Sequence, residues 1–104
     1  MLGKNFVVLF LFGSPLALAE WVGPYEIENI EIHSSGVYFY RADGYSTATP
    51  CGGKNWIKFS GETKLSDRAL SVGLTAQASK RPVNYSITGC EGVYLLADRI
   101  QLPK

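Results

Sequence analysis

The sequence predicts a small, mainly β domain that contains one helix and one disulfide. Three observations lead to this prediction. Several segments rich in β-branched and aromatic residues alternate apolar and polar side chains, one segment shows helical spacing instead, and the chain holds two cysteines, Cys51 and Cys90. The helical segment divides the predicted strands into a larger group before it and a smaller group after it.

Residues 1–19 have the features of a signal peptide. Lys4 supplies a positive start, residues 6–12 form an unbroken apolar run, and Ala17-Leu18-Ala19 fits a cleavage site. The apolar run is shorter than the roughly 20 residues that a membrane-spanning helix needs. We therefore expect residues 20–104 to form a single secreted or periplasmic domain without a transmembrane segment.

Cys51 and Cys90 are expected to pair in such an oxidising compartment. Two cysteines allow only one intramolecular bond, so the connectivity follows from their number. Closing the long loop between them would stabilise a domain of this size by several kcal/mol, because it restricts the unfolded chain. Free thiols and pairing with another chain are the alternatives.

A long bent strand is expected at residues 25–33. Its side chains alternate between apolar and polar, but Ile27 and Ile30 are three residues apart, which breaks the period of two. Such a slip indicates a bulge or a bend near Glu28, as a strand that curves through a barrel requires.

Two further strands are expected before the helix. Residues 37–40 are rich in β-forming side chains and follow turn residues, so they should form a hairpin with the first strand. Residues 55–60 alternate as a third strand. Between these two strands, residues 42–53 contain glycine and proline and are expected to form a loop.

A helix is expected over residues 66–79. Ser66 is a good N-cap residue, and Pro82 prevents the helix from continuing much beyond residue 79. Gly73 in the helix interior either allows a neighbouring backbone to approach closely or is simply tolerated. One wide apolar face made largely of small side chains is expected. Leu70, Leu74 and Ala78 recur there at four-residue spacing, and the residues beside them are Ala69, Val72, Gly73 and Ala76.

Two strands are expected after the helix. Residues 83–88 alternate cleanly, residues 89–92 should turn the chain, and residues 93–102 should form the last strand. The expected core residues of these two strands are Val83, Tyr85, Ile87, Val93, Leu95, Ala97 or Leu96, Ile100 and Leu102. The resulting order, β-β-β-α-β-β, matches the OB-fold, a five-stranded and partly open barrel. A small α+β sandwich or a roll is also compatible with this order.

The charge balance argues against nucleic acid as a partner. The chain has ten Lys and Arg against nine Asp and Glu, and removal of Lys4 with the leader makes the two numbers equal. A protein that binds nucleic acid needs a basic surface to neutralise phosphates.

The sequence holds no cluster that indicates catalysis or metal binding. Its single histidine, His33, precedes Ser34 and Ser35, but neighbours on a strand point to opposite faces and do not form a nucleophile with its base. With both cysteines expected in a disulfide, only scattered carboxylates are left as metal ligands. The acidic residues near the first strand, Glu31 among them, are interpreted as its solvated side. We therefore expect a protein that is not an enzyme and needs no cofactor.

Aromatic side chains are the feature that favours a binding role. The chain carries two tryptophans and six tyrosines, whose apolar faces and polar tips suit both sugars and protein surfaces. Tyr38 and Tyr40 share one face of their strand, and Val37 and Phe39 share the other. One of these pairs should belong to the core, and the other can be exposed.

Five features together carry a resemblance to a known family: the leader, the Tyr-Phe strand at residues 37–40, the disulfide, the helix at residues 65–78 before a basic Pro-Val strand, and Cys90 followed by Val93-Tyr94-Leu95. In this pattern the chain resembles the B subunits of the subtilase cytotoxin and typhoid toxin type, and a wider group of small secreted bacterial proteins. The resemblance implies an OB-fold protomer that assembles as a pentameric ring, binds sialylated glycans and docks an enzymatic A subunit.

The same resemblance suggests a ligand site. Ser35 is the nearest match to the serine that contacts the sugar in these toxins. Tyr38 and the loop at residues 43–49, with Tyr45 in it, complete the suggested site. The chain is shorter after the helix and at its end, so the other sugar contacts of the family have no match. The leading hypothesis is a binding domain that recognises a glycan or a protein. The alternative is a small periplasmic inhibitor or immunity-type protein, in which the loop at residues 42–53 blocks the cleft of an enzyme.

Overall fold

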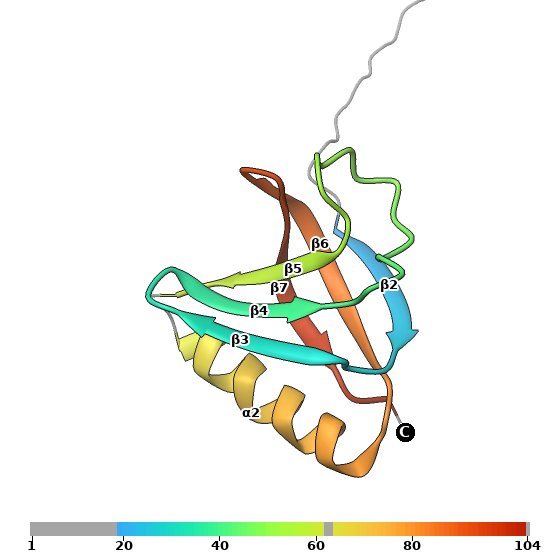
Figure 1. Ribbon diagram of the computed structural model, residues 1–104, viewed down its shortest axis with the longest axis vertical. Helices are drawn as coiled ribbons and strands as arrows, with labels where there is room; N and C mark the ends of the chain where they lie inside the picture. Colours follow the sequence, from blue (N-terminus) through green and yellow to red (C-terminus); the bar gives the residue numbers. More distant parts are fainter. Residues whose placement is uncertain (1–18, 62–63, 104) are drawn as a thin grey trace, which may run out of the picture.

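The structure is a computed structural model that describes residues 19–61 and 64–103 (Figure 1). Within these ranges it contains six strands and one helix, so the predicted mainly β fold with one helix is confirmed. The elements are β2 (Glu20–Tyr25), β3 (Asn29–His33), β4 (Gly36–Tyr40), β5 (Trp56–Ser60), α2 (Lys64–Ser79), β6 (Val83–Glu91) and β7 (Tyr94–Gln101). The predicted signal peptide, apart from Ala19, lies outside the described residues.

The six strands form one mixed sheet in the order β2-β6-β7-β5-β4-β3. Adjacent strands are antiparallel except for β5 and β7, which are parallel. The sheet is strongly bent, and β3, β4 and β5 cross over β2, β6 and β7 in Figure 1. Within this sheet β2 and β3 are the two edge strands and do not pair with each other, so the described strand pairings do not close a barrel.

The prediction of one bent first strand, and therefore of five strands in all, is wrong. The segment is divided between β2, which already begins at Glu20, and β3. β2 pairs with β6, whereas β3 pairs with β4, and residues 26–28 connect the two strands. The slip between Ile27 and Ile30 therefore marks the point at which the chain leaves one edge of the sheet and joins the other.

The helix α2 begins at Lys64 and lies along β3 at the lower end of the bent sheet (Figure 1). The prediction that Ser66 is the N-cap is therefore wrong, because Ser66 lies in the first turn, where its hydroxyl donates to the carbonyl of Gly61 at 3.5 Å. The predicted end at residue 79 is confirmed. Lys80 adopts a left-handed conformation with φ of 56°, and Pro82 cannot extend the helix.

The helix packs through small side chains, as predicted, but the predicted face is too wide, because it includes Leu74 and Ala78. Leu74 is 50% exposed, and Ala78 is exposed as well. The buried residues of α2 are Ser66, Ala69, Gly73 and Ala76. A Cβ atom at Gly73 would lie 2.5 Å from Cε1 of Phe39, so the close neighbour is a side chain and not a backbone. Small residues occupy the buried face of α2 because they let the helix lie close to the large rings of the sheet.

The core lies between α2 and the inner face of the sheet. Phe39, Phe59 and Tyr85 are at its centre, with ring centroids of Phe39 and Phe59 5.6 Å apart. The predicted inward positions Val83, Tyr85, Ile87, Leu95 and Ala97 are all buried. Ile100 and Leu102 pack against this core. Val93 is 57% exposed, which corrects its assignment to the core: β6 continues to Glu91, and the turn occupies residues 92–93.

A disulfide and a group of hydrogen bonds are among the contacts that hold the loop at residues 41–55 against the sheet. The predicted disulfide is confirmed, since Cys51 and Cys90 are bonded, with Cα atoms 5.6 Å apart. At the start of β2, the Glu20 carboxylate accepts hydrogen bonds from the loop, and the one from the Thr47 hydroxyl contributes most to lowering the pKa of Glu20. The other donors are the backbone amide of Ala48 at 2.9 Å and the hydroxyl of Thr49 at 3.0 Å.

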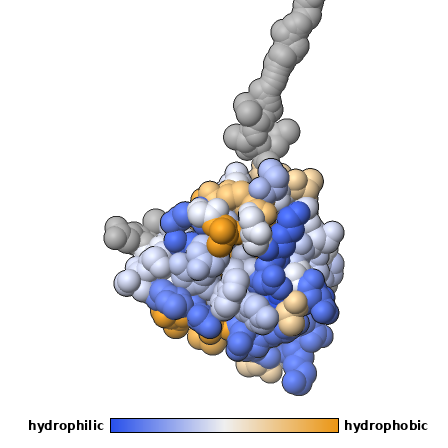
Figure 2. Space-filling view, turned by 45° about the horizontal axis from the view of Figure 1, so that its top comes forward, coloured by the Kyte–Doolittle hydropathy of each residue, from blue (hydrophilic) through white to orange (hydrophobic). Residues whose placement is uncertain are grey.

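The surface in the view of Figure 2 is mostly hydrophilic, with hydrophobic colour in separate spots. The large apolar side chains that are exposed come from different elements, and they are Trp21, Ile32, Leu74 and Val93. Among the described residues, α2 is neither long nor apolar enough to cross a membrane.

Candidate functional site

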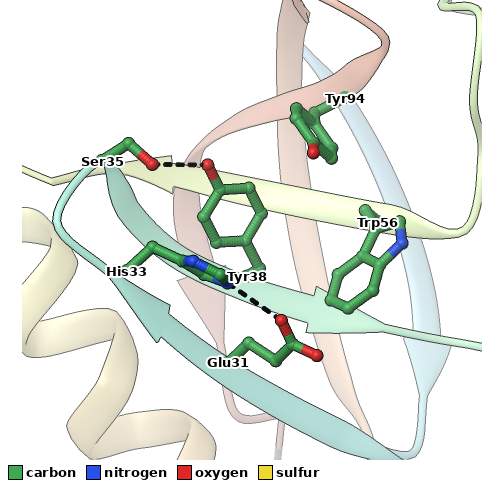
Figure 3. A pocket seen from close by; sticks show the side chains of 6 residues that line it. All are labelled: Glu31, His33, Ser35, Tyr38, Trp56 and Tyr94. Atoms are coloured by element: carbon green, nitrogen blue, oxygen red, sulfur yellow. Dashed lines mark hydrogen bonds and ion pairs between the residues drawn. The ribbon is translucent and has the colours of Figure 1, made fainter.

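A pocket of about 350 Å³ opens on the outer face of the sheet, on the side away from the core. Figure 3 shows that its side chains come from neighbouring strands and from the turn between β3 and β4. Its lining residues are Glu31, His33, Ser35, Tyr38, Trp56 and Tyr94.

The register of the strands places these side chains together. On β4, Phe39 points into the core, so its neighbour Tyr38 points to the outer face. Glu31 of β3 lies directly opposite Tyr38, and Lys58 of β5 lies opposite it on the other side. The alternation that builds the core therefore also builds the outer row of polar and aromatic residues.

Tyr38 is the centre of an aromatic cluster. Its ring centroid lies 4.9 Å from that of His33, 5.1 Å from Tyr94 and 6.2 Å from Trp56, and all three contacts are edge-to-face. Tyr38 is only 7% exposed, although it lies on the outer face. The neighbouring rings therefore hold Tyr38 in one orientation, and they line the pocket together with it.

Two hydrogen bonds organise the polar groups of the pocket (Figure 3). The hydroxyls of Ser35 and Tyr38 are joined at 2.8 Å. The Nε2 atom of His33 donates to Oε1 of Glu31 at 2.9 Å. Since two hydroxyls share one hydrogen in their mutual bond, the pair keeps one hydrogen to donate and also has lone pairs to accept.

An ion pair lies next to the pocket. Nζ of Lys58 donates to Oε2 of Glu91 at 2.6 Å and lies 5.6 Å from the ring centroid of Tyr38. Ser60 donates to the other carboxylate oxygen at 3.1 Å. The hydrogen bond with Glu91 raises the pKa of Lys58, and the bond with Lys58 lowers the pKa of Glu91. Lys58 is 5% exposed, so its charge is balanced by Glu91 instead of by solvent.

The structure brings two of the three predicted ligand residues together. Ser35 and Tyr38 line the pocket and bond to each other, but Tyr45 is 4% exposed and lies in the core. The Tyr45 hydroxyl donates to the backbone carbonyl of Phe39 at 3.1 Å, and burial raises the pKa of Tyr45. Its ring contacts that of Tyr85 at 5.6 Å. Tyr45 therefore anchors the loop from inside the fold.

Sequence reasoning did not assign the other lining residues to a site. On sequence alone, Glu31 belongs to a solvated side and His33 is unsuited to catalysis, and Trp56 and Tyr94 are two of many aromatic residues. The signal that could have found them is the cross-strand register, which sequence alone does not give. Among residues 19–61 and 64–103, no three His, Cys, Asp or Glu side chains are grouped to hold a metal ion.

Fold and site together define the class of this chain as a small β domain with one disulfide and an aromatic pocket on the outer face of its sheet. No protein-family model, curated protein or solved structure matches the chain.

Proposed function

We propose that this chain is an exported, non-enzymatic binding domain that recognises a glycan through the pocket around Ser35 and Tyr38. The observation that carries the proposal is the bonded hydroxyl pair of these two residues inside a frame of aromatic rings. Sugars offer both hydroxyl groups and flat apolar C–H faces, and this pocket presents a partner for each.

The order of the strands supports an OB-like architecture for the domain. If β2 and β3 are taken together as one interrupted strand, the order becomes that of a five-stranded barrel with α2 after its third strand. The resemblance to toxin B subunits further suggests a pentameric ring, in which several copies of the pocket would act together and raise the avidity for a multivalent surface. The molar mass of the oxidised protein in solution, measured by light scattering, tests this assembly.

The second candidate, an inhibitor that blocks an enzyme cleft with residues 42–53, has less support. Residues 47–49 of this loop are held by hydrogen bonds to Glu20, and Cys51 is held by the disulfide, so these residues are tied to the domain itself. A protein partner is therefore expected to bind outside residues 42–53. Stoichiometric recovery of one hydrolase in a pull-down would favour the inhibitor over the glycan-binding domain.

Binding to a broad glycan panel tests the proposed function. The protein is exported from cells that express the full chain and is used with its disulfide intact. We expect retention on a subset of glycans, and Ser35→Ala should weaken it roughly fivefold, because one hydrogen bond contributes about 1 kcal/mol. Ser34→Ala is the matched control, since Ser34 lies in the same turn but does not line the pocket.

Two results would contradict the proposal. One is retention on no glycan of the panel. The other is an equal effect of Ser35→Ala and Ser34→Ala, which would place the bound sugar outside this pocket.

A further inference from the structure

We infer that the pocket selects the neutral terminus of a glycan and disfavours a terminus that carries a carboxylate, such as sialic acid. This inference rests on the proposed function and narrows its ligand. It also departs from the resemblance to the toxin subunits, which implies sialylated glycans. The charges in and around the pocket carry the argument.

The lining of the pocket contains a carboxylate and no lysine or arginine. Of the six lining side chains, Glu31 is the acidic one, and His33 donates to one of its oxygens at 2.9 Å. The Glu31 side chain is 48% exposed, and its second oxygen points away from His33 in Figure 3. A bound ligand therefore meets a negative group at this wall of the pocket.

The cations on the adjoining strands already have partners. Lys58, which lies beside Tyr38, is paired with Glu91 at 2.6 Å and is 5% exposed. Arg41, which follows β4, lies over the ring of Tyr25 at 4.5 Å and donates to the carbonyl of Gly44 at 2.7 Å. A ligand carboxylate would have to separate Lys58 from Glu91 or draw Arg41 away from its contacts to gain a countercharge.

The hydrogen-bonding groups of the pocket also fit a neutral sugar better. The Glu31 carboxylate only accepts hydrogen bonds, and the Ser35–Tyr38 pair has one hydrogen left to donate. Sugar hydroxyls both donate and accept, so they can bond to each of these groups. A ligand carboxylate only accepts, so it would compete for the single remaining hydrogen and would repel Glu31.

Pairs of glycans that differ only in a terminal sialic acid test the inference. We expect the oxidised protein to bind the neutral member of each pair at least about fivefold more tightly. This ratio corresponds to the repulsion of two like charges about 4 Å apart in water. Glu31→Gln should lower this ratio of affinities towards one, because it removes the negative charge and keeps the shape of the side chain.

Glu26→Gln is the matched control, since Glu26 is an exposed carboxylate that does not line the pocket, and it should leave the ratio unchanged. In a second variant, Glu91→Gln removes the partner of Lys58 and should shift binding towards the sialylated member. Equal or tighter binding of the sialylated members would overturn the inference while leaving the glycan-binding function in place. Binding of neither member in any pair would remove the inference together with the function.

Discussion

Two aromatic clusters lie back to back on the same strands, and neighbouring residues of β4 belong to different clusters. Phe39 joins the inner cluster, in which its ring lies 5.6 Å from those of Phe59 and Tyr85. Tyr38 joins the outer cluster with His33, Trp56 and Tyr94. The inner rings of Phe39 and Phe59 are fully buried beneath α2, whereas the outer rings cover one another.

The two clusters differ in the hydrogen-bond partners of their tyrosine hydroxyls. In the core, the Tyr45 hydroxyl donates to the backbone of Phe39, and burial raises the pKa of both Tyr45 and Tyr85. On the outer face, the Tyr38 hydroxyl is bonded to Ser35, a side chain exposed to solvent. An aromatic cluster thus serves stability where a helix covers it and is available for recognition where its polar groups reach the surface.

The largest expected difference between the clusters is in stability. Phe39→Ala should lower the free energy of unfolding by about 3–5 kcal/mol, because it leaves a cavity under the helix. Trp56→Ala should cost about 1–2 kcal/mol, because it removes two aromatic contacts on a face that no helix covers. Urea denaturation followed by fluorescence or circular dichroism measures both values. Equal losses would show that the outer cluster is part of the core.

A smaller effect is expected where the helix meets the inner cluster. Gly73→Ala should destabilise the protein by about 1–3 kcal/mol, because the added methyl group overlaps the Phe39 ring and outweighs the better helix propensity of alanine. Leu74→Ala, next to it but half-exposed, should cost less than about 1 kcal/mol. The same denaturation measurement compares them, and a stabilising Gly73→Ala would mean that the helix lies further from the sheet.

The smallest effect is expected at the ion pair beside the outer cluster. The folded-state pKa of Glu91 is lowered, so its stabilising contribution is present above the ordinary value of 4.5 and is lost as the pH falls through the folded-state value. The pKa of Lys58 is raised, so its contribution is present below 10.5 and is lost as the pH rises through its folded-state value.

Thermal unfolding across this pH range checks the prediction. Glu91→Gln should flatten the pH dependence at both ends, whereas Glu26→Gln should not. An unchanged profile in Glu91→Gln would show that the pair contributes no measurable stability, as is common for partly exposed pairs.

Features of the fold that depend on residues close in sequence were largely predicted correctly, and, apart from the disulfide, those that depend on residues far apart in sequence were not. β-forming side chains identified β4, alternation within the strand identified β5 and β6, and the count of cysteines gave the Cys51–Cys90 disulfide. Spacing alone could not show that β2 and β3 lie at opposite edges, because β2 pairs with β6, a strand that follows the helix, and not with the next strand in sequence. The helix face was predicted too wide for a similar reason, since the contact between Gly73 and the Phe39 ring, which leaves Leu74 half-exposed, depends on a distant strand.

The site was predictable only in part. Ser35 and Tyr38 were proposed from the family resemblance, and the structure places both in one pocket. Glu31, Trp56 and Tyr94 reach the same pocket from three strands, through registers that local pattern does not encode. Tyr45 shared the loop sequence that suggested a site, but the packing of its ring draws it into the core.

The separation of β2 from β3 also predicts the order in which the strands pair as the chain folds. β3, β4 and β5 pair through neighbouring segments, so this meander can form as soon as the residues up to Ser60 are available. β2 is the first strand of the sheet in sequence, yet its partner β6 comes after the helix, with Glu20 opposite Ile87. Loop closure over such a distance is slow. We therefore expect β2, the first strand of the sheet in sequence, to be among the last to pair, with neither of its edges covered by the sheet until β6 arrives.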